Sequence, residues 1–218
     1  KGTTIGIVGE SDRGLTLSAL GHVGLTEDDV TIAVLGESAP LLANSLQNGQ
    51  VSAIVGAISD FVALTSQGVT TKNILPPEMS LQPANNYAIR HDAVGGENDA
   101  LIEGYLRGWA KGAAAGLVDL DVTRAIAMEA DPENWVNEDL GTIFLEAAQG
   151  LHTPAGDTYG DLRVDIWDAV IAEMAAIGSI TGEVSTDEIL NPVYIDRVNS
   201  FEQADIRADV AAWKAENM

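Results

Sequence analysis

The sequence predicts an α/β fold: a lobe of parallel βαβ units followed by a mainly helical C-terminal part. Near the start of the chain, short β-branched runs alternate with segments of helical apolar spacing, a pattern typical of a parallel sheet with right-handed crossovers. After residue 92 helical spacing dominates and strand patterns are scarce. We therefore expect two domains, an α/β ligand-binding lobe over residues 1–92 and a mainly helical part over residues 93–218.

The first domain is expected to contain repeated strand–helix pairs. Its expected strands are residues 3–8, 30–35 and 51–55, followed by helices that begin near Leu15, Pro40 and Phe61. A further extended stretch at residues 86–90 is expected to form another strand. The helices expected in the second domain are residues 99–115, 122–130, 137–149, 164–177 and 206–216.

Composition excludes several classes of function. The chain has 33 acidic and 11 basic residues and a net charge of −22, which would repel the phosphates of nucleic acids. Cysteine is absent, so disulfides, cysteine nucleophiles and thiolate metal sites are excluded. The 3 histidines lie far apart in the sequence, and the glycines fit no nucleotide-binding motif. We expect no nucleic acid partner, no metal and no cofactor.

The first two strand–helix units echo one another. Each strand leads into the same tripeptide, Gly9-Glu10-Ser11 in the first unit and Gly36-Glu37-Ser38 in the second. In open parallel sheets ligands bind beyond the carboxyl ends of the strands, where helix N-termini offer unpaired amides. This rule selects three loops as the candidate ligand-binding site, with the residues Gly9, Glu10, Ser11, Asp12, Arg13, Gly36, Glu37, Ser38, Ala57, Ser59 and Asp60.

The residue types in these loops leave three roles open. Backbone amides and serine hydroxyls can hold a carboxylate, sulfonate or nitrate, with Arg13 as a charged clamp. Alternatively, Glu10, Glu37 or Asp60 can receive an amine or a heterocycle. In the third case the loops bind nothing: Ser11 and Ser38 cap the helices that follow, and the acidic residues compensate helix dipoles.

Catalytic patterns are weak, so we expect a protein that is not an enzyme. No Gly-x-Ser-x-Gly motif occurs, and nothing places a histidine beside the loop serines. The pair His91-Asp92 would point to opposite faces if both residues lay on one strand. The alternative is an enzyme of pyrimidine or menaquinone-precursor metabolism on the same scaffold, with Glu10, Asp60 or His91 as its acid or base.

Four passages carry a resemblance to a known family. They are Lys1-Gly2-Thr3-Thr4-Ile5-Gly6-Ile7, Gln47-Asn48-Gly49-Gln50-Val51-Ser52-Ala53, Asn86-Tyr87-Ala88-Ile89-Arg90-His91-Asp92 and Asp187-Glu188-Ile189-Leu190-Asn191-Pro192-Val193-Tyr194. In order and spacing they resemble the nitrate, sulfonate, taurine and thiamine-precursor group of periplasmic solute-binding proteins of ABC importers. The resemblance covers nearly the whole chain but lacks the family's N-terminal portion.

The resemblance implies a type 2 periplasmic-binding-protein fold that captures a small polar solute and delivers it to an ABC permease in the membrane. It also implies a periplasmic or extracytoplasmic location, although no signal peptide opens this chain. A missing lobe would leave an apolar surface through which the chain self-associates. Glu10 stands where the family has Ser or Thr, so a pyrimidine or amine-bearing solute fits better than a simple inorganic anion.

Overall fold

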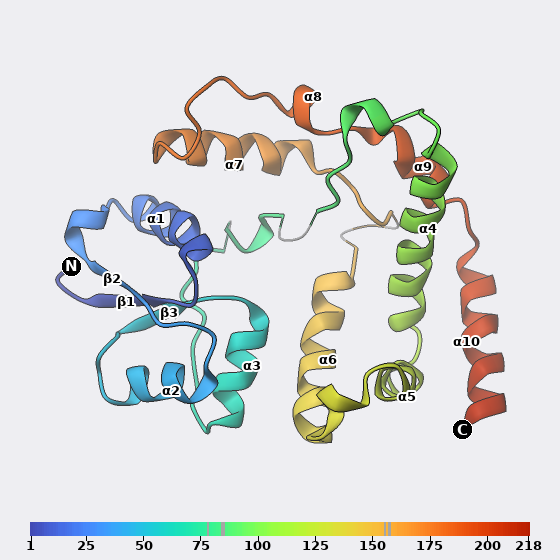
Figure 1. The fold of residues 1–218 in the computed structure, drawn as a ribbon, viewed down its shortest axis with the longest axis horizontal. Coiled ribbons are helices and arrows are strands. Elements are labelled where there is room, and N and C mark those ends of the chain that lie inside the picture. Colours follow the sequence, from blue (N-terminus) through green and yellow to red (C-terminus); the bar gives the residue numbers. More distant parts are fainter. Residues whose placement is uncertain (78, 84–85, 155, 157) are drawn as a thin grey trace. The chain divides into compact units, whose positions relative to one another are not determined.

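The computed structural model describes residues 1–77, 79–83, 86–154, 156 and 158–218. The chain is mixed α/β and divides into two compact units (Figure 1). The first unit contains residues 1–84 and 163–189, and the second contains residues 85–162 and 190–218. Residues 163–189 thus belong to the sheet-containing unit, whereas the sequence assigned them to the helical part. The boundary at residue 92 stays a prediction.

A parallel sheet of three strands forms the centre of the first unit. Its strands are β1 (Thr4–Ile7), β2 (Thr31–Val34) and β3 (Ala53–Val55), in the order β2-β1-β3. The register pairs Ile5 with Ile32 on one side and with Ala53 on the other. All three strands were expected from the sequence, and so was their parallel direction.

Three helices follow the three strands. They are α1 (Arg13–His22), α2 (Ala39–Gln47) and α3 (Ile58–Ser66). The chain moves from β1 to one neighbour and then across β1 to the other, so right-handed crossovers place α1 and α2 on opposite faces of the sheet. Figure 1 shows this arrangement, with α3 on the same face as α2.

Apolar packing beneath α2 and α3 forms the core of the first unit. Leu42 of α2 and Leu64 of α3 are fully buried against Val8, at the end of β1. Full burial of a leucine side chain stabilises a fold by roughly 1.5–3 kcal/mol. The core therefore fixes the carboxyl ends of the strands, where the candidate site lies.

The later segment of the first unit is held against α1 by a buried polar contact. It contains α7 (Val164–Ala176) and α8 (Thr186–Ile189). The Ser18 hydroxyl of α1 donates a 2.7 Å hydrogen bond to Oε2 of Glu173 in α7, and the Gln82 amide donates to the same oxygen at 2.8 Å. This long-range contact joins residues that lie 155 positions apart in the sequence.

The second unit is helical. Its helices are α4 (Asp99–Gly116), α5 (Leu120–Ala130), α6 (Glu138–His152), α9 (Ile195–Val198) and α10 (Gln203–Asn217). Ala110 and Ala114 of α4 are buried beside Ile206 of α10. Small side chains at these positions let neighbouring elements approach α4 closely. The longer helices were expected from apolar spacing, whereas α9 was not.

Ionic hydrogen bonds anchor the start of α4 to the segment around α9. The Tyr194 hydroxyl donates to Oδ1 of Asp99 at 2.6 Å, and Arg197 donates to Oδ2 of Asp99 at 2.7 Å. Arg197 also donates from Nε to Oε2 of Glu103 at 2.6 Å. Arg107 bonds Glu103 and also donates to the backbone carbonyl of Arg197 at 2.9 Å. The two carboxylates and two guanidiniums therefore act as one network.

The expected strand at residues 86–90 does not form. Tyr87 instead packs edge-to-face against Tyr105, with the ring centroids 5.5 Å apart, and against Trp109, with the centroids 5.8 Å apart. Arg90 is ion-paired with Asp92 at 2.5 Å. No strand of the described residues pairs with this segment, since the sheet consists of β1, β2 and β3. The extended character of this stretch therefore misled the prediction, because a strand also needs a partner strand.

Two buried serines should respond oppositely to replacement by alanine. The Ser45 hydroxyl of α2 is buried without a hydrogen-bond partner among the described residues, whereas the buried Ser18 hydroxyl bonds Glu173. Ser45→Ala removes an unsatisfied polar group, so we expect the free energy of unfolding to stay constant or to rise by up to about 1 kcal/mol. Ser18→Ala should lower it by about 2 kcal/mol.

Urea denaturation of the two variants at pH 7 provides the measurement. Both substitutions place alanine in a helix, so the gain in helix propensity is the same in each and cancels in the comparison. A loss of stability in Ser45→Ala equal to that in Ser18→Ala would contradict the assignment of these two hydroxyls.

The hydrogen bonds to Asp99 should make the free energy of unfolding depend on pH in the acidic range. The Tyr194 hydroxyl, followed by Arg197 and the Gly95 amide, lowers the pKa of Asp99 from 3.8 to about 2. Because the folded pKa lies below the unfolded value, the ionised group stabilises the fold above pH about 4, and this contribution is lost as pH falls from about 4 to about 2. Tyr194→Phe raises the folded pKa, so stability should fall less steeply across this range.

Urea midpoints measured between pH 7 and pH 2.5 test this dependence. Tyr159→Phe is the matched control, because it removes a hydroxyl from the same core without touching Asp99. If the urea midpoints of both tyrosine variants fall with pH as steeply as those of the parent protein, the assignment of the Tyr194–Asp99 hydrogen bond is wrong.

Candidate functional site

The three candidate loops meet at one edge of the sheet, as the sequence predicted for the carboxyl ends of parallel strands. The amide of Val8 donates to the Val55 carbonyl at 3.1 Å, which joins the loop after β1 to the end of β3. The amide of Gly36 donates to the Val8 carbonyl at 3.1 Å, which joins the loop after β2 to the same point. Val8 is therefore the backbone junction of the candidate site.

The strand order places a topological switch point within this edge. From β1 the chain crosses to β2 on one side and then returns to β3 on the other. Loops that leave β1 and β3 consequently diverge toward opposite faces of the sheet, and ligands of open α/β sheets bind in the crevice between such loops. Residues after Val8 and after Val55 therefore flank the position where this class of sheet binds its ligands.

Aspartates satisfy the backbone amides of these two loops. Oδ2 of Asp12 accepts a 2.9 Å hydrogen bond from the Gly9 amide, and the Asp12 amide donates back to the Gly9 carbonyl at 3.0 Å. Asp60 repeats this geometry with Ala57, at 2.7 Å and 3.0 Å. Each aspartate thus supplies the N3 half of a capping box, and its own amide closes a backbone turn at the start of the helical segment. One amide in each of these two loops is thus bonded to a carboxylate of the chain itself.

The loop serines do not cap the helices as the sequence suggested. Ser11 lies inside a 3-10 turn, Glu10–Asp12, and its side chain caps neither that turn nor α1. Ser38 occupies the N-cap position of α2, yet its hydroxyl makes no capping hydrogen bond, and Ser59 lies in the first turn of α3. In two of the loops an aspartate at the third helical position accepts a hydrogen bond from the loop amide. A carboxylate therefore caps these segments in place of a serine hydroxyl.

Arg13 is already neutralised by acidic neighbours. Its guanidinium donates to both oxygens of Glu10, at 2.8 Å and 3.1 Å, and from Nη1 to Glu27 at 2.7 Å. The hydrogen bonds that Arg13 donates to Glu10 hold the pKa of Glu10 below its ordinary value and raise the pKa of Arg13. A guanidinium held by two carboxylates has little attraction left for an anionic ligand.

Two glycines are required by the geometry of the edge. A Cβ at Gly56 would lie 2.7 Å from Oδ2 of Asp60 and 2.7 Å from a methyl carbon of Val8. Gly36 has φ +79°, a left-handed conformation that side chains disfavour. The chain can therefore make its tight turns after β2 and β3 only with these glycines.

The edge is predominantly negative. Glu37 is exposed, whereas Asp60 and Asp12 are partly buried with one oxygen of each bonded to an amide. A carboxylate offers about four acceptor positions, so each aspartate retains acceptor capacity beyond its amide bond. Chemically the edge can accept hydrogen bonds from N–H and O–H groups. Within the described residues, no group of three or more His, Asp or Glu side chains is arranged to hold a metal ion.

The residues proposed for an enzyme belong to both units. His91 opens a 3-10 turn, His91–Ala93, in the second unit, whereas Glu10 and Asp60 belong to the first. Asp92 pairs with Arg90, and this hydrogen bond holds the pKa of Asp92 below its ordinary value. Because residues 86–90 form no strand, the reason given for separating His91 from Asp92 does not apply.

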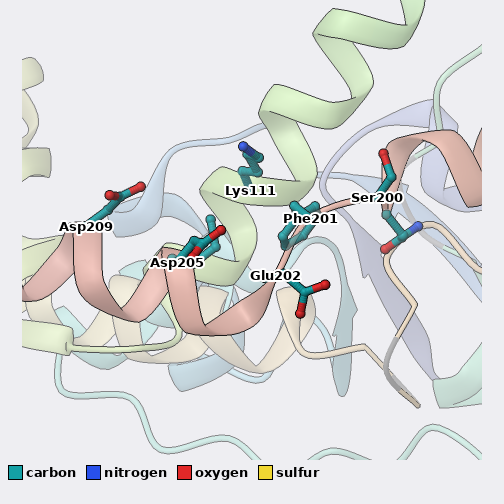
Figure 2. Close-up of a pocket in the computed structure, with 8 residues that line it drawn as sticks. Lys111, Ser200, Phe201, Glu202, Asp205 and Asp209 are labelled. Atoms are coloured by element: carbon teal, nitrogen blue, oxygen red, sulfur yellow. The ribbon is translucent and has the colours of Figure 1, made fainter.

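A hollow of about 500 Å³ lies in the helical unit and was not foreseen (Figure 2). Its lining residues come from α4, from the connection between α9 and α10, and from the start of α10: Lys111, Asn199, Ser200, Phe201, Glu202, Asp205, Ile206 and Asp209. The signal in the sequence was a row of acidic residues at 202, 205 and 209, which share one face of a helix. The sequence did not predict this hollow, because a row of acidic residues does not indicate which helix packs against it.

Comparison of the chain with protein-family models, with curated proteins and with solved structures finds no match. Among the helices of the described residues, none combines the length and apolar content that crossing a membrane requires.

Substitution of Gly56 tests the packing of the candidate site. Gly56→Ala drives a methyl group against Asp60 and Val8, so we expect the free energy of unfolding to fall by about 1–3 kcal/mol. Gly14 in α1 has no atom within 4 Å of an added Cβ, so Gly14→Ala should raise stability by about 0.4–1 kcal/mol. Thermal denaturation of both variants measures the difference, and equal effects would show that the edge is loosely packed.

Proposed function

We propose that this chain is the solute-binding component of an ABC importer, capturing a small polar nutrient at the carboxyl edge of its parallel sheet. The observation that carries this proposal is the meeting of three strand-end loops at a topological switch point. The type 2 periplasmic-binding-protein fold, delivery to a membrane permease and an extracytoplasmic location rest on the resemblance of four sequence passages to that family.

The hydrogen bonding of the loops supports a nutrient that donates hydrogen bonds rather than an inorganic anion. Asp12 and Asp60 bond the amides of Gly9 and Ala57, so these two amides are not available to nitrate or a sulfonate. Arg13 is bonded to Glu10 and Glu27. A pyrimidine of the thiamine-precursor type carries N–H groups that carboxylate oxygens can accept, so it is favoured over sulfonate and nitrate.

Capture by such a protein makes and breaks no covalent bond. Binding of one solute is expected to be saturable and to leave the solute chemically unchanged. The serine hydroxyls of the edge, at positions 11, 38 and 59, add donors and acceptors that orient a polar heterocycle.

A thermal-shift screen tests the proposal. The purified chain is heated with pyrimidines, amino acids, taurine, alkanesulfonates, bicarbonate and nitrate. A ligand present at 100 times its Kd stabilises the folded state by about 2.7 kcal/mol. We expect a shift from the pyrimidines and none from nitrate or the sulfonates. A shift confined to the anions would contradict the assignment of ligand class.

Two acidic substitutions show whether the bound compound lies at the proposed edge. Glu37→Gln removes a charge from the loop after β2, and Asp28→Asn removes one from the opposite, amino end of the same strand. Both side chains are exposed. Glu37→Gln should weaken binding about two- to five-fold, whereas Asp28→Asn should leave it unchanged. Equal responses would place the compound elsewhere.

A further inference from the structure

A single Asn-Gly step occurs in the sequence, at Asn48-Gly49. It lies in the connection between α2 and β3, and both residues are exposed to solvent. Glycine has no side chain, so its amide nitrogen can approach the side chain of the preceding residue without obstruction. The carboxamide of Asn48 is therefore open to attack by the backbone nitrogen that follows it.

A Schellman turn ends α2 at this step. Asn48 is the C-cap residue, and Gly49 follows in the left-handed conformation with φ +66°. The Gly49 amide donates to the Leu46 carbonyl at 3.0 Å, and the Gln50 amide donates to the Ser45 carbonyl at 2.9 Å. These two backbone hydrogen bonds define the motif. In the folded chain the Gly49 nitrogen is thus engaged as a hydrogen-bond donor.

The backbone at Asn48 also holds the reacting atoms apart. Closure of a succinimide ring requires the Gly49 nitrogen to lie alongside Cβ of Asn48 across the bond between Cα and the carbonyl carbon. Asn48 has ψ 2°, which places the Gly49 nitrogen alongside the Asn48 nitrogen instead. The turn must therefore open, and ψ of Asn48 must change, before the ring can close.

The turn is attached to buried structure on both sides. On the helix side Leu42 of α2 is fully buried. On the strand side Val51 is buried, and its amide donates to the same Ser45 carbonyl at 3.1 Å. A change in the backbone at Asn48 therefore acts on the junction between the packed helix and the sheet.

We propose that Asn48 is a site of spontaneous deamidation whose rate is limited by the Schellman turn. When the turn opens, the Gly49 amide nitrogen loses its proton to solvent base and attacks Cγ of Asn48. The bond between this nitrogen and Cγ forms, the Cγ–Nδ2 bond breaks, and Nδ2 takes a proton from water and leaves as ammonia. Water then opens the succinimide ring. Attack at Cγ gives aspartate, and attack at the backbone carbonyl carbon gives β-linked isoaspartate.

Either product weakens the end of α2. A carboxylate adds negative charge at the C-terminus of the helix, where the helix dipole is already negative. The β-linked product also lengthens the main chain by one atom within the turn. The modified chain is therefore expected to unfold at a lower urea concentration than the parent chain. This modification does not rest on the solute proposed for the sheet edge.

Peptide mapping by mass spectrometry, after incubation of the full chain at mildly alkaline pH, tests this inference. Trypsin releases residues 14–72 as one peptide, which contains Asn44 as well as Asn48. Asn44 is also exposed but lies within α2 before Ser45, so it is an internal control. We expect Asn48 to convert to the acid while Asn44 stays intact. In urea the conversion should be about ten-fold faster or more, because two backbone hydrogen bonds no longer hold the turn closed.

The end of α3 provides a matched variant, because it has the same turn. Gln67 is its C-cap residue, Gly68 has φ +74°, and the Gly68 amide donates to the Thr65 carbonyl at 2.9 Å. Gln67→Asn places an Asn-Gly step in this second turn. The variant should gain a second deamidation within the same tryptic peptide, again accelerated by urea. Asn48→Gln should abolish the conversion at position 48.

Three results would overturn the proposal. The first is equal conversion of Asn44 and Asn48, because the Asn-Gly step would then have no special reactivity. The second is conversion of Asn48 at the same rate with and without urea, because the turn would then give no protection. The third is an unmodified Asn48 after incubation in urea.

Discussion

Backbone pairing of β1 with both of its neighbours is the constraint on which the first unit depends. β1 bonds β2 along one edge and β3 along the other, so the ends of all three strands are fixed relative to one another. The amide and carbonyl of Val8 extend this pairing by one residue into the loops. Because Val8 also packs on Leu42 and Leu64, the same residue joins the hydrogen-bonded sheet to the core. The candidate site is therefore positioned by residues that belong to both the paired sheet and the packed core.

The kind of ligand that this edge can bind depends on whether its backbone amides are bonded to the chain's own carboxylates or left for an anion. Amides at the start of a helix favour negative charge, which is the basis of anion sites in many α/β proteins. Here the chain supplies the negative charge itself, since Asp12 and Asp60 reach back to Gly9 and Ala57. An edge organised in this way offers carboxylate acceptors to a ligand, beside the serine hydroxyls. The difference comes from one side chain per loop and not from the fold.

The same acidic composition has different consequences in the second unit. Asp99 and Glu103 are bonded by Arg197 and Tyr194, so their charges stabilise the contact between α4 and the segment around α9. Three acids along α10 have no such partners among the ion pairs of the described residues. Net charge alone therefore does not separate structural carboxylates from those that can meet a ligand. That distinction needs the position of each cationic side chain.

The sequence by itself determined the local elements of this protein. Short β-branched runs located β1, β2 and β3, and apolar spacing near 3.6 residues located the longer helices, because it reflects which face of a helix is buried. The same runs also located the three loops of the candidate edge, because parallel strands must end together. Each of these features depends on residues close together in the chain.

Tertiary structure decided what depends on residues far apart in the sequence. The segment at residues 86–90 lacks a partner strand, which its own composition did not reveal. Residues 163–189 join the first unit through contacts such as that of Glu173 with Ser18. The Arg13 guanidinium is held by Glu27 as well as by Glu10, and Lys111 lies over Phe201. Propensity and spacing describe single elements, whereas the pairing of side chains is set only when those elements pack together.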